Sequence, residues 1–157
     1  MFTLELKDDD LERALARLGS GLEDMSGVTN EIGGFLAESH QQRIERSLGA
    51  PDGTAWALNS PFTKTRDPRP LIDSGEMVRN INHQYGPDYA EVIATGRQVR
   101  TMHYGAAKGA FGQTTNGRPI PWGDIPARPF MGLSETDRSN IAEALQEWFE
   151  GLLAKGN

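Results

Sequence analysis

The chain has 157 residues, a formal net charge of −6 and a hydrophobic fraction of 37%, which together predict one acidic domain with a modest core. The negative charge argues against general affinity for nucleic acid or anionic membranes, and no apolar run is long enough to span a bilayer. Because the chain has no cysteine, disulfides and thiolate metal sites are excluded. We expect a soluble intracellular protein without a signal peptide.

The N-terminal part of the chain is predicted to be a short strand followed by a helix. Apolar and polar residues alternate over Phe2–Leu6, which is typical of a strand with one buried face. The aspartates at positions 8–10 favour a helix start, because negative charge is stabilising at a helix N-terminus. Leucines spaced over residues 11–22 then predict a first helix that is broken or loosened at Gly19–Gly21.

A second and longer helix is predicted from about residue 23 to residue 48. Gly33 and Gly34 lie inside it, and each costs about 1 kcal/mol of helix stability relative to alanine. Their presence indicates close packing against another backbone.

The middle of the chain is predicted to hold a loop and a hairpin. Residues 49–70 combine turn chemistry with several basic side chains. Met77–Gln84 and Tyr89–Ala94 are then predicted as two strands, joined by Tyr85–Asp88, whose Gly-Pro-Asp sequence is a hairpin signal. Val99–Tyr104 is a third strand or an irregular segment.

Residues 105–124 are rich in glycine and are predicted to form a second long loop. The order of helices, antiparallel strands and a final helix gives an α+β fold in a single domain over residues 1–157.

The segment Ile125–Ser134 is predicted to be an extended arm that enters the last helix. Pro126 and Pro129 fix φ and remove backbone donors, so this stretch cannot be a helix interior or a central strand. Ser134 can cap the helix that follows, whose apolar residues recur with a 3.6-residue period. Its apolar stripe comprises Ile141, Leu145, Trp148, Phe149 and Leu152.

Candidate catalytic groups do not form a convincing site. His83 and His103 could meet across the sheet, but two imidazoles without a third ligand make a weak metal site. His40 has no partner at metal-binding spacing, and Ser74 lacks the glycine elbow of a nucleophile. Gly105–Gly112 fails as a phosphate-binding loop because its lysine is followed by glycine. No catalytic residue, metal ion or cofactor is expected.

Basic and aromatic residues of the loops are the candidates for contacts with partners. The basic residues fall in the middle and late loops, whereas the acidic residues concentrate in the terminal helices. This asymmetry suits a ring-forming subunit and equally an ordinary solvated surface. The interface candidates are Trp56, Arg66, Arg69, Lys108, Arg118, Trp122 and Arg128. Phe130 is expected to fill the core, and Arg128 is expected to pair with a carboxylate of this or a neighbouring subunit.

Several motifs in order resemble the phage virion morphogenesis proteins, the tail-completion group. They are Pro51-Asp-Gly-Thr-Ala-Trp56, Leu71-Ile-Asp-Ser-Gly75, the Tyr104–Gly112 stretch, and Ile125–Ser134 with Asp137. Members often carry a His-Gln pair before the Phe-Gly, whereas this chain has Ala-Lys-Gly-Ala there.

The resemblance implies a structural virion protein, not an enzyme, that assembles as a ring at the phage neck or tail end. The implied partners are further copies of the chain, expected as a hexamer, and other neck and tail-tube proteins. DNA would at most pass through the ring lumen, and no membrane is involved. The alternative is a capsid-assembly factor that is absent from the mature virion. A third hypothesis, a hydrolase or metal-dependent enzyme using Asp73, His83 and His103, is the weakest.

Overall fold

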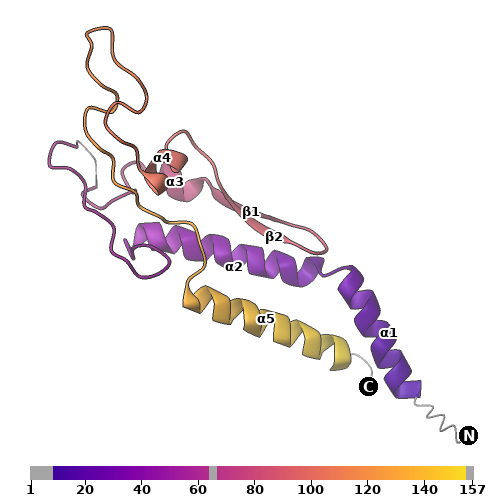
Figure 1. Ribbon diagram of the computed structural model, residues 1–157. Helices are drawn as coiled ribbons and strands as arrows, with labels where there is room; N and C mark the ends of the chain where they lie inside the picture. Colours follow the sequence, from indigo (N-terminus) through magenta and orange to yellow (C-terminus); the bar gives the residue numbers. More distant parts are fainter. Residues whose placement is uncertain (1–8, 64–66, 155–157) are drawn as a thin grey trace, which may run out of the picture.

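The computed structural model describes residues 9–63 and 67–154, which form an elongated molecule with helices at one end and long loops at the other (Figure 1). The elements are α1 (Asp9–Glu23), α2 (Ser26–Glu45), α3 (Glu76–Arg79), β1 (Ile81–Tyr85), β2 (Ala90–Ala94), α4 (Val99–Tyr104) and α5 (Glu135–Ala154). The predicted α+β class is confirmed.

Helix α2 is the centre of the fold and is buried on two sides. The β1–β2 hairpin packs against it on one side and α5 on another (Figure 1). One apolar cluster at the loop-proximal end joins Ala37, Ile44, Trp56, Ile81 and Phe130. A second cluster joins Val28, Ile32 and Leu36 of α2 to Ile141, Leu145 and Trp148 of α5. Because both clusters draw on α2, its burial depends on chain segments from both the middle and the end of the sequence.

The hairpin and the final helix agree with prediction. β1 and β2 pair antiparallel, with Ile81 opposite Ala94 and Tyr85 opposite Ala90. Helix α5 begins directly after Ser134, whose Oγ accepts a hydrogen bond from the Asp137 backbone N–H at 3.1 Å. The predicted cap of the last helix is therefore confirmed.

Two predicted strand segments are helical instead. The start of the predicted strand Met77–Gln84 forms α3, because the Glu76 N–H bonds to the Ser74 Oγ and starts a helical turn. The segment Val99–Tyr104 is α4, which places Val99 and His103 one turn apart. Both side chains pack towards the first apolar cluster, so the relevant spacing is helical rather than alternating.

The first helix is continuous, contrary to the break predicted at Gly19–Gly21. α1 runs through these residues to Glu23 and packs against α5. A Cβ at Gly21 would lie 2.4 Å from the Leu152 side chain, so this glycine lets the two helices approach closely. The predicted strand at Phe2–Leu6 lies outside the described residues.

Gly33 marks a close contact, but with a side chain rather than with a backbone. A Cβ at Gly33 would lie 2.7 Å from the imidazole of His83 on β1. The same imidazole bonds through its Nε2 to the Asn30 Oδ1 at 2.9 Å. A Cβ at Gly34 would lie 3.9 Å from the His83 ring, which is ordinary van der Waals contact. One glycine of the pair therefore seats the hairpin on α2.

Candidate interaction surface

The arm Ile125–Ser134 is extended and hydrogen-bonded to several elements of its own chain. As predicted, Pro126 and Pro129 lie in a stretch without helix or strand. The Arg128 N–H donates to the Met102 carbonyl at 2.9 Å, and the Trp56 indole N–H donates to the Pro129 carbonyl at 2.9 Å. The arm thus connects α4 to the loop that follows α2.

Phe130 is the anchor of the arm, as predicted, and is fully buried. Its ring lies edge-on to the imidazole of His103, with centroids 5.2 Å apart. Its carbonyl accepts a hydrogen bond from the Arg43 guanidinium at 2.9 Å. The same guanidinium forms an ion pair with Asp137 at 3.1 Å, and both side chains are almost completely buried. The arm is therefore fixed to α2 and α5 at one point.

Asp137 is stabilised as a carboxylate by the groups around it. Burial raises its pKa, but the Ser39 hydroxyl at 2.6 Å, the Ser134 N–H and hydroxyl, and the Arg43 charge outweigh burial. The pKa of Asp137 consequently lies below its usual value. The charged carboxylate accepts hydrogen bonds from Ser134 at the start of α5 and also pairs with the Arg43 guanidinium.

His40 joins the same network as a neutral imidazole. The Gly132 N–H donates to its Nε2 at 3.0 Å, and its Nδ1 bonds to the Leu36 carbonyl. Burial is the main cause that lowers the pKa of His40, and the nearby Arg43 charge adds to it. An Nε2 that accepts a hydrogen bond cannot carry a proton, so geometry and pKa agree.

Arg128 braces the loop after Trp56 from inside. Its guanidinium donates to the carbonyls of Ala57 at 2.7 Å and Leu58 at 3.0 Å, and contacts the Asn59 amide oxygen at 3.5 Å. Only 5% of the residue is exposed, and burial lowers its pKa. Its partners within the described chain are therefore neutral oxygens rather than the carboxylate that we expected.

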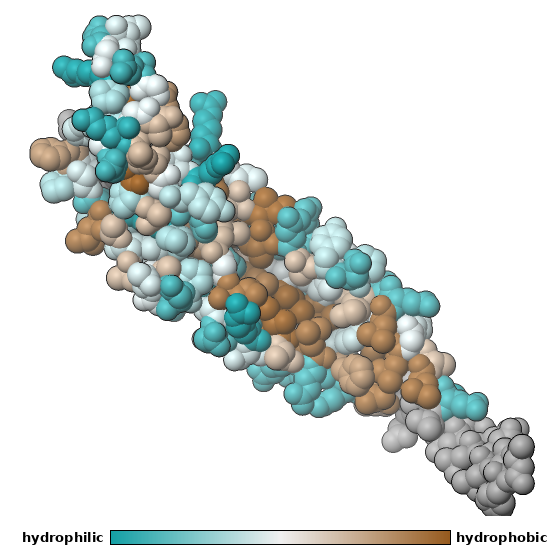
Figure 2. Space-filling view, viewed as in Figure 1, coloured by the Kyte–Doolittle hydropathy of each residue, from teal (hydrophilic) through white to brown (hydrophobic). Residues whose placement is uncertain are grey.

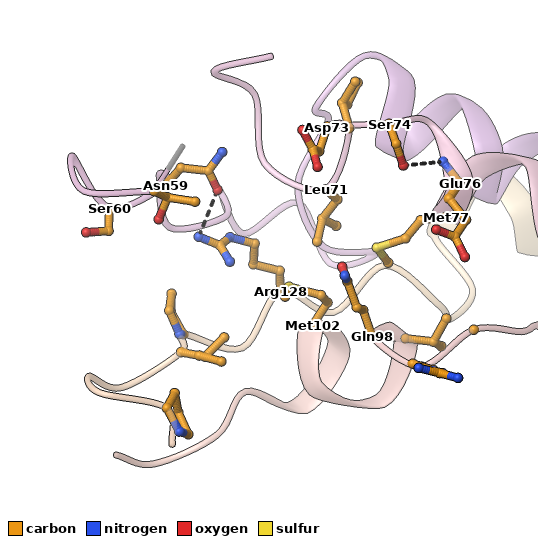
Figure 3. Close-up of a pocket in the computed structure, with 18 of the residues that line it drawn as sticks. Asn59, Ser60, Leu71, Asp73, Ser74, Glu76, Met77, Gln98, Met102 and Arg128 are labelled. Carbon is orange, nitrogen blue, oxygen red and sulfur yellow. Dashed lines mark hydrogen bonds between the residues drawn. The ribbon is translucent and has the colours of Figure 1, made fainter. Parts of the chain in front are cut away.

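A cavity of about 790 Å³ lies beside Arg128. Figure 3 shows Met77, Gln98 and Met102 on one side of it and Asn59 and Ser60 on the other, with Arg128 between them. Phe62 and Trp122 also line it, with ring centroids 6.3 Å apart, and both are more than two-thirds exposed. This part of the molecule thus presents large aromatic side chains on a braced frame.

The loop of residues 105–124 folds back on itself. Isolated bridges join Ala106 to Ile125 and Gln113 to Pro119. Gly105 has a φ of 76°, and a Cβ there would lie 2.6 Å from the Ile125 carbonyl oxygen, which requires glycine at this position. The predicted long loop therefore doubles back on itself, and its base is bridged to the first residue of the arm.

The interface candidates occupy different environments. Arg69, Trp122 and Arg128 line the cavity, whereas Lys108 and Arg118 are exposed on the long loop and do not line it. Trp56 belongs to the first apolar cluster, and Arg66 lies outside the described residues.

Arg69 is exposed and connects its own loop to the end of α2. Its guanidinium bonds to both carboxylate oxygens of Asp67, which lowers the pKa of Asp67 to about 2, and to the Glu45 carbonyl at 2.8 Å. The role of these residues in contacts between subunits stays a prediction.

Hydrophobic surface gathers away from the loops as well. Figure 2 shows it over the seam between α2 and α5 and again where α1 approaches the end of α5. The exposed apolar side chains include Leu15 and Leu22 on α1 and Phe149 and Leu153 on α5.

Sequence reasoning missed the buried polar network of His40, Arg43 and Asp137. A signal was present, because Arg43 directly precedes the buried Ile44 in a helix that is apolar on two sides. A charge among core positions requires a buried partner.

The histidines occupy separate sites. His83 lies on β1 and His103 on α4, so the hypothesis that they face each other across a sheet is wrong. Among the residues that the structure describes, no group of three or more histidine, aspartate or glutamate side chains could hold a metal ion. None of the helices in the described part of the chain is long and apolar enough to cross a membrane.

Comparisons with known proteins agree with the motifs. The model of the phage virion morphogenesis family matches residues 6–150. The putative capsid assembly protein G of Escherichia phage Mu is 27% identical over 144 residues, covering 87% of this chain and 86% of that protein. The Mu-like prophage FluMu G protein 2 of Haemophilus influenzae is 26% identical over 154 residues, covering 98% of this chain and 99% of that protein. No solved structure matches.

Proposed function

Because the chain belongs to the phage virion morphogenesis family, we propose that it is a structural protein of the phage neck or tail end, forming a ring that completes the tail and helps join it to the head. A role in phage virion morphogenesis follows from the family itself. The family match, which spans most of the chain, is the observation that carries the proposal.

The architecture supports a role in assembly. The arm and Arg128 fix the loops to the body of the subunit, and those loops expose Phe62, Phe111 and Trp122. Exposed aromatic side chains on a preorganised frame are typical of protein interfaces, because little conformational entropy is lost when they dock. We propose that such contacts link the subunit to further copies of itself and to neck and tail-tube proteins.

We propose a structural rather than a catalytic role. Two of the three residues of the competing enzyme hypothesis have structural roles: His83 packs the hairpin against α2, and His103 packs against Phe130.

A second candidate is a capsid-assembly factor that leaves the particle. It is favoured by the name of the phage Mu relative, a putative capsid assembly protein. Mass spectrometry of purified virions separates the two, because a neck component is present in the mature particle and an assembly factor is absent.

A clean deletion in a phage that encodes the chain tests the proposal. We expect separate filled heads with unfinished or unattached tails in electron micrographs, and recovery when the gene is supplied in trans. Normal infectious particles from the deletion would contradict both roles.

A further inference from the structure

The segment of residues 92–123 carries positive charge only and lies between Glu91 and Asp124 in the sequence. It contains no aspartate or glutamate, and each of its four cations is exposed. None of the four forms an ion pair within the described part of the chain. They are Arg97, Arg100, Lys108 and Arg118. We call this segment the basic segment.

Helix α5 carries the opposite charge. After Arg138, the helix has no further cation up to its end at Ala154, while Glu143, Glu147 and Glu150 are all exposed. Glu143 and Glu147 are four residues apart and so lie on one face of the helix. Neither forms an ion pair with any described residue. We call these three glutamates and their surroundings the acidic face of α5.

Each of the two surfaces also exposes apolar side chains. In the basic segment these are Tyr104, Phe111 and Trp122, and on α5 they are Phe149 and Leu153. In an interface of this kind, apolar contacts at the centre contribute affinity, and complementary charges at the rim fix the orientation of the partners.

The basic segment and the acidic face of α5 cannot contact each other within one subunit. The long loop lies at one end of the molecule, and α5 runs towards the opposite end, near α1 (Figure 1). Two different complementary surfaces on one chain permit a head-to-tail contact, and repetition of that contact generates a ring if the rotation closes.

We propose that the basic segment of one subunit docks on the acidic face of α5 of the next copy. The inference rests on the proposed ring and specifies which surfaces form its repeated contact. Isolated like-charge contacts at such an interface are unfavourable, so the charges also select the head-to-tail register over a symmetric pairing.

Charge reversal with compensation is the first test. The variants R97E/R100E and E143K/E147K each place like charges across the contact, and each is expected to lower the titre of complemented phage by at least about 100-fold. The chain carrying all four changes restores opposite charges and is expected to return to within about 10-fold of wild type. The control E12K/E31K, at exposed positions of α1 and α2, changes the net charge by the same amount as E143K/E147K and is expected to have no effect.

Circular dichroism and urea unfolding of each purified variant verify that it is folded. The contact would be overturned if the chain with all four changes is folded but its titre does not recover. It would also be overturned if R97E/R100E and E143K/E147K leave the titre unchanged.

Cysteine cross-linking locates the contact directly, because the natural chain has no cysteine. The double variant T115C/N140C, with one cysteine in the basic segment and one on the face of Glu143, is expected to give a ladder of oligomers with a bismaleimide in lysates of phage-producing cells. The control T115C/E31C, which pairs the same loop position with α2, should remain monomeric. A ladder from the control and none from T115C/N140C would overturn the inference.

The same lysates separate this inference from the proposed function. A T115C/N140C ladder together with absence of the chain from purified virions supports the contact and contradicts the neck location. Presence in virions without this ladder supports the neck location and overturns the contact.

Discussion

The guanidinium of Arg43 on α2 and the carboxylate of Asp137 on α5 form a buried ion pair at 3.1 Å. Arg43 also donates to the carbonyls of Phe130 and Gly132, so a single side chain joins two helices and the arm. This pair explains how the arm is held relative to the two helices.

Removal of the Arg43 side chain should therefore be strongly destabilising. Arg43→Ala leaves the Asp137 carboxylate buried without its cation, and we expect the free energy of unfolding to fall by about 3–5 kcal/mol. Urea denaturation followed by circular dichroism measures this loss. The exposed Arg46 is the matched control, and Arg46→Ala should change stability by less than about 0.5 kcal/mol. Equal effects of the two substitutions would contradict the structural role of the pair.

Arg128 should act as a brace rather than as a contact with a partner. Arg128→Ala leaves the carbonyls of Ala57 and Leu58 without their donor, and we expect a loss of about 1–3 kcal/mol. Hydrogen exchange should quicken at residues 57–62, while Arg118→Ala, on the exposed loop, should alter neither quantity. Unchanged stability and exchange combined with lost particle assembly would instead identify Arg128 as an interface residue.

The two adjacent glycines of α2 should respond in opposite directions to the same substitution. Gly33→Ala drives a methyl group into the His83 imidazole and should destabilise the chain by about 1–3 kcal/mol, because the hairpin must shift. Gly34→Ala has room and should stabilise the helix by up to about 1 kcal/mol. Thermal unfolding of both variants checks the prediction, which fails if their melting temperatures move together.

Stability should fall when the solution becomes mildly acidic. Burial holds the pKa of folded His40 below 6.5, so below about pH 6.5 the unfolded chain binds a proton that the folded chain does not bind. The free energy of unfolding should consequently decrease as the pH drops through this range, with a further decrease below 3.8 as Asp137 becomes protonated.

Urea unfolding between pH 8 and pH 5 tests the contribution of His40. His40→Gln should reduce the slope but not abolish it, because burial also lowers the pKa of His103. An unchanged slope in His40→Gln would contradict the assignment.

The elements that could be predicted from sequence are those with strong local signals. The Gly-Pro-Asp turn identified the hairpin, and Ser134 with the stripe from Ile141 identified α5. Helix α4 escaped prediction because six residues hold too little periodicity, and its orientation depends on contact between His103 and the distant Phe130. Tertiary contact, rather than local preference, decides such a segment.

The polar network escaped for a related reason. Arg43 and Asp137 are separated by 94 residues, and no local pattern indicates that they meet. Arg128 was singled out from its place between two prolines, yet its partners became clear only from the path of the loop after Trp56.

The long sequence separation between Arg43 and Phe130, 87 residues, has a consequence for synthesis on the ribosome. Helix α2 emerges early, but Phe130 and the apolar residues of α5 that cover it are translated last. A nascent chain interrupted before the arm would leave the side of α2 that faces α5 in water and could not complete either cluster. A chain that ends before the arm therefore lacks Phe130 of the first cluster and the α5 residues of the second.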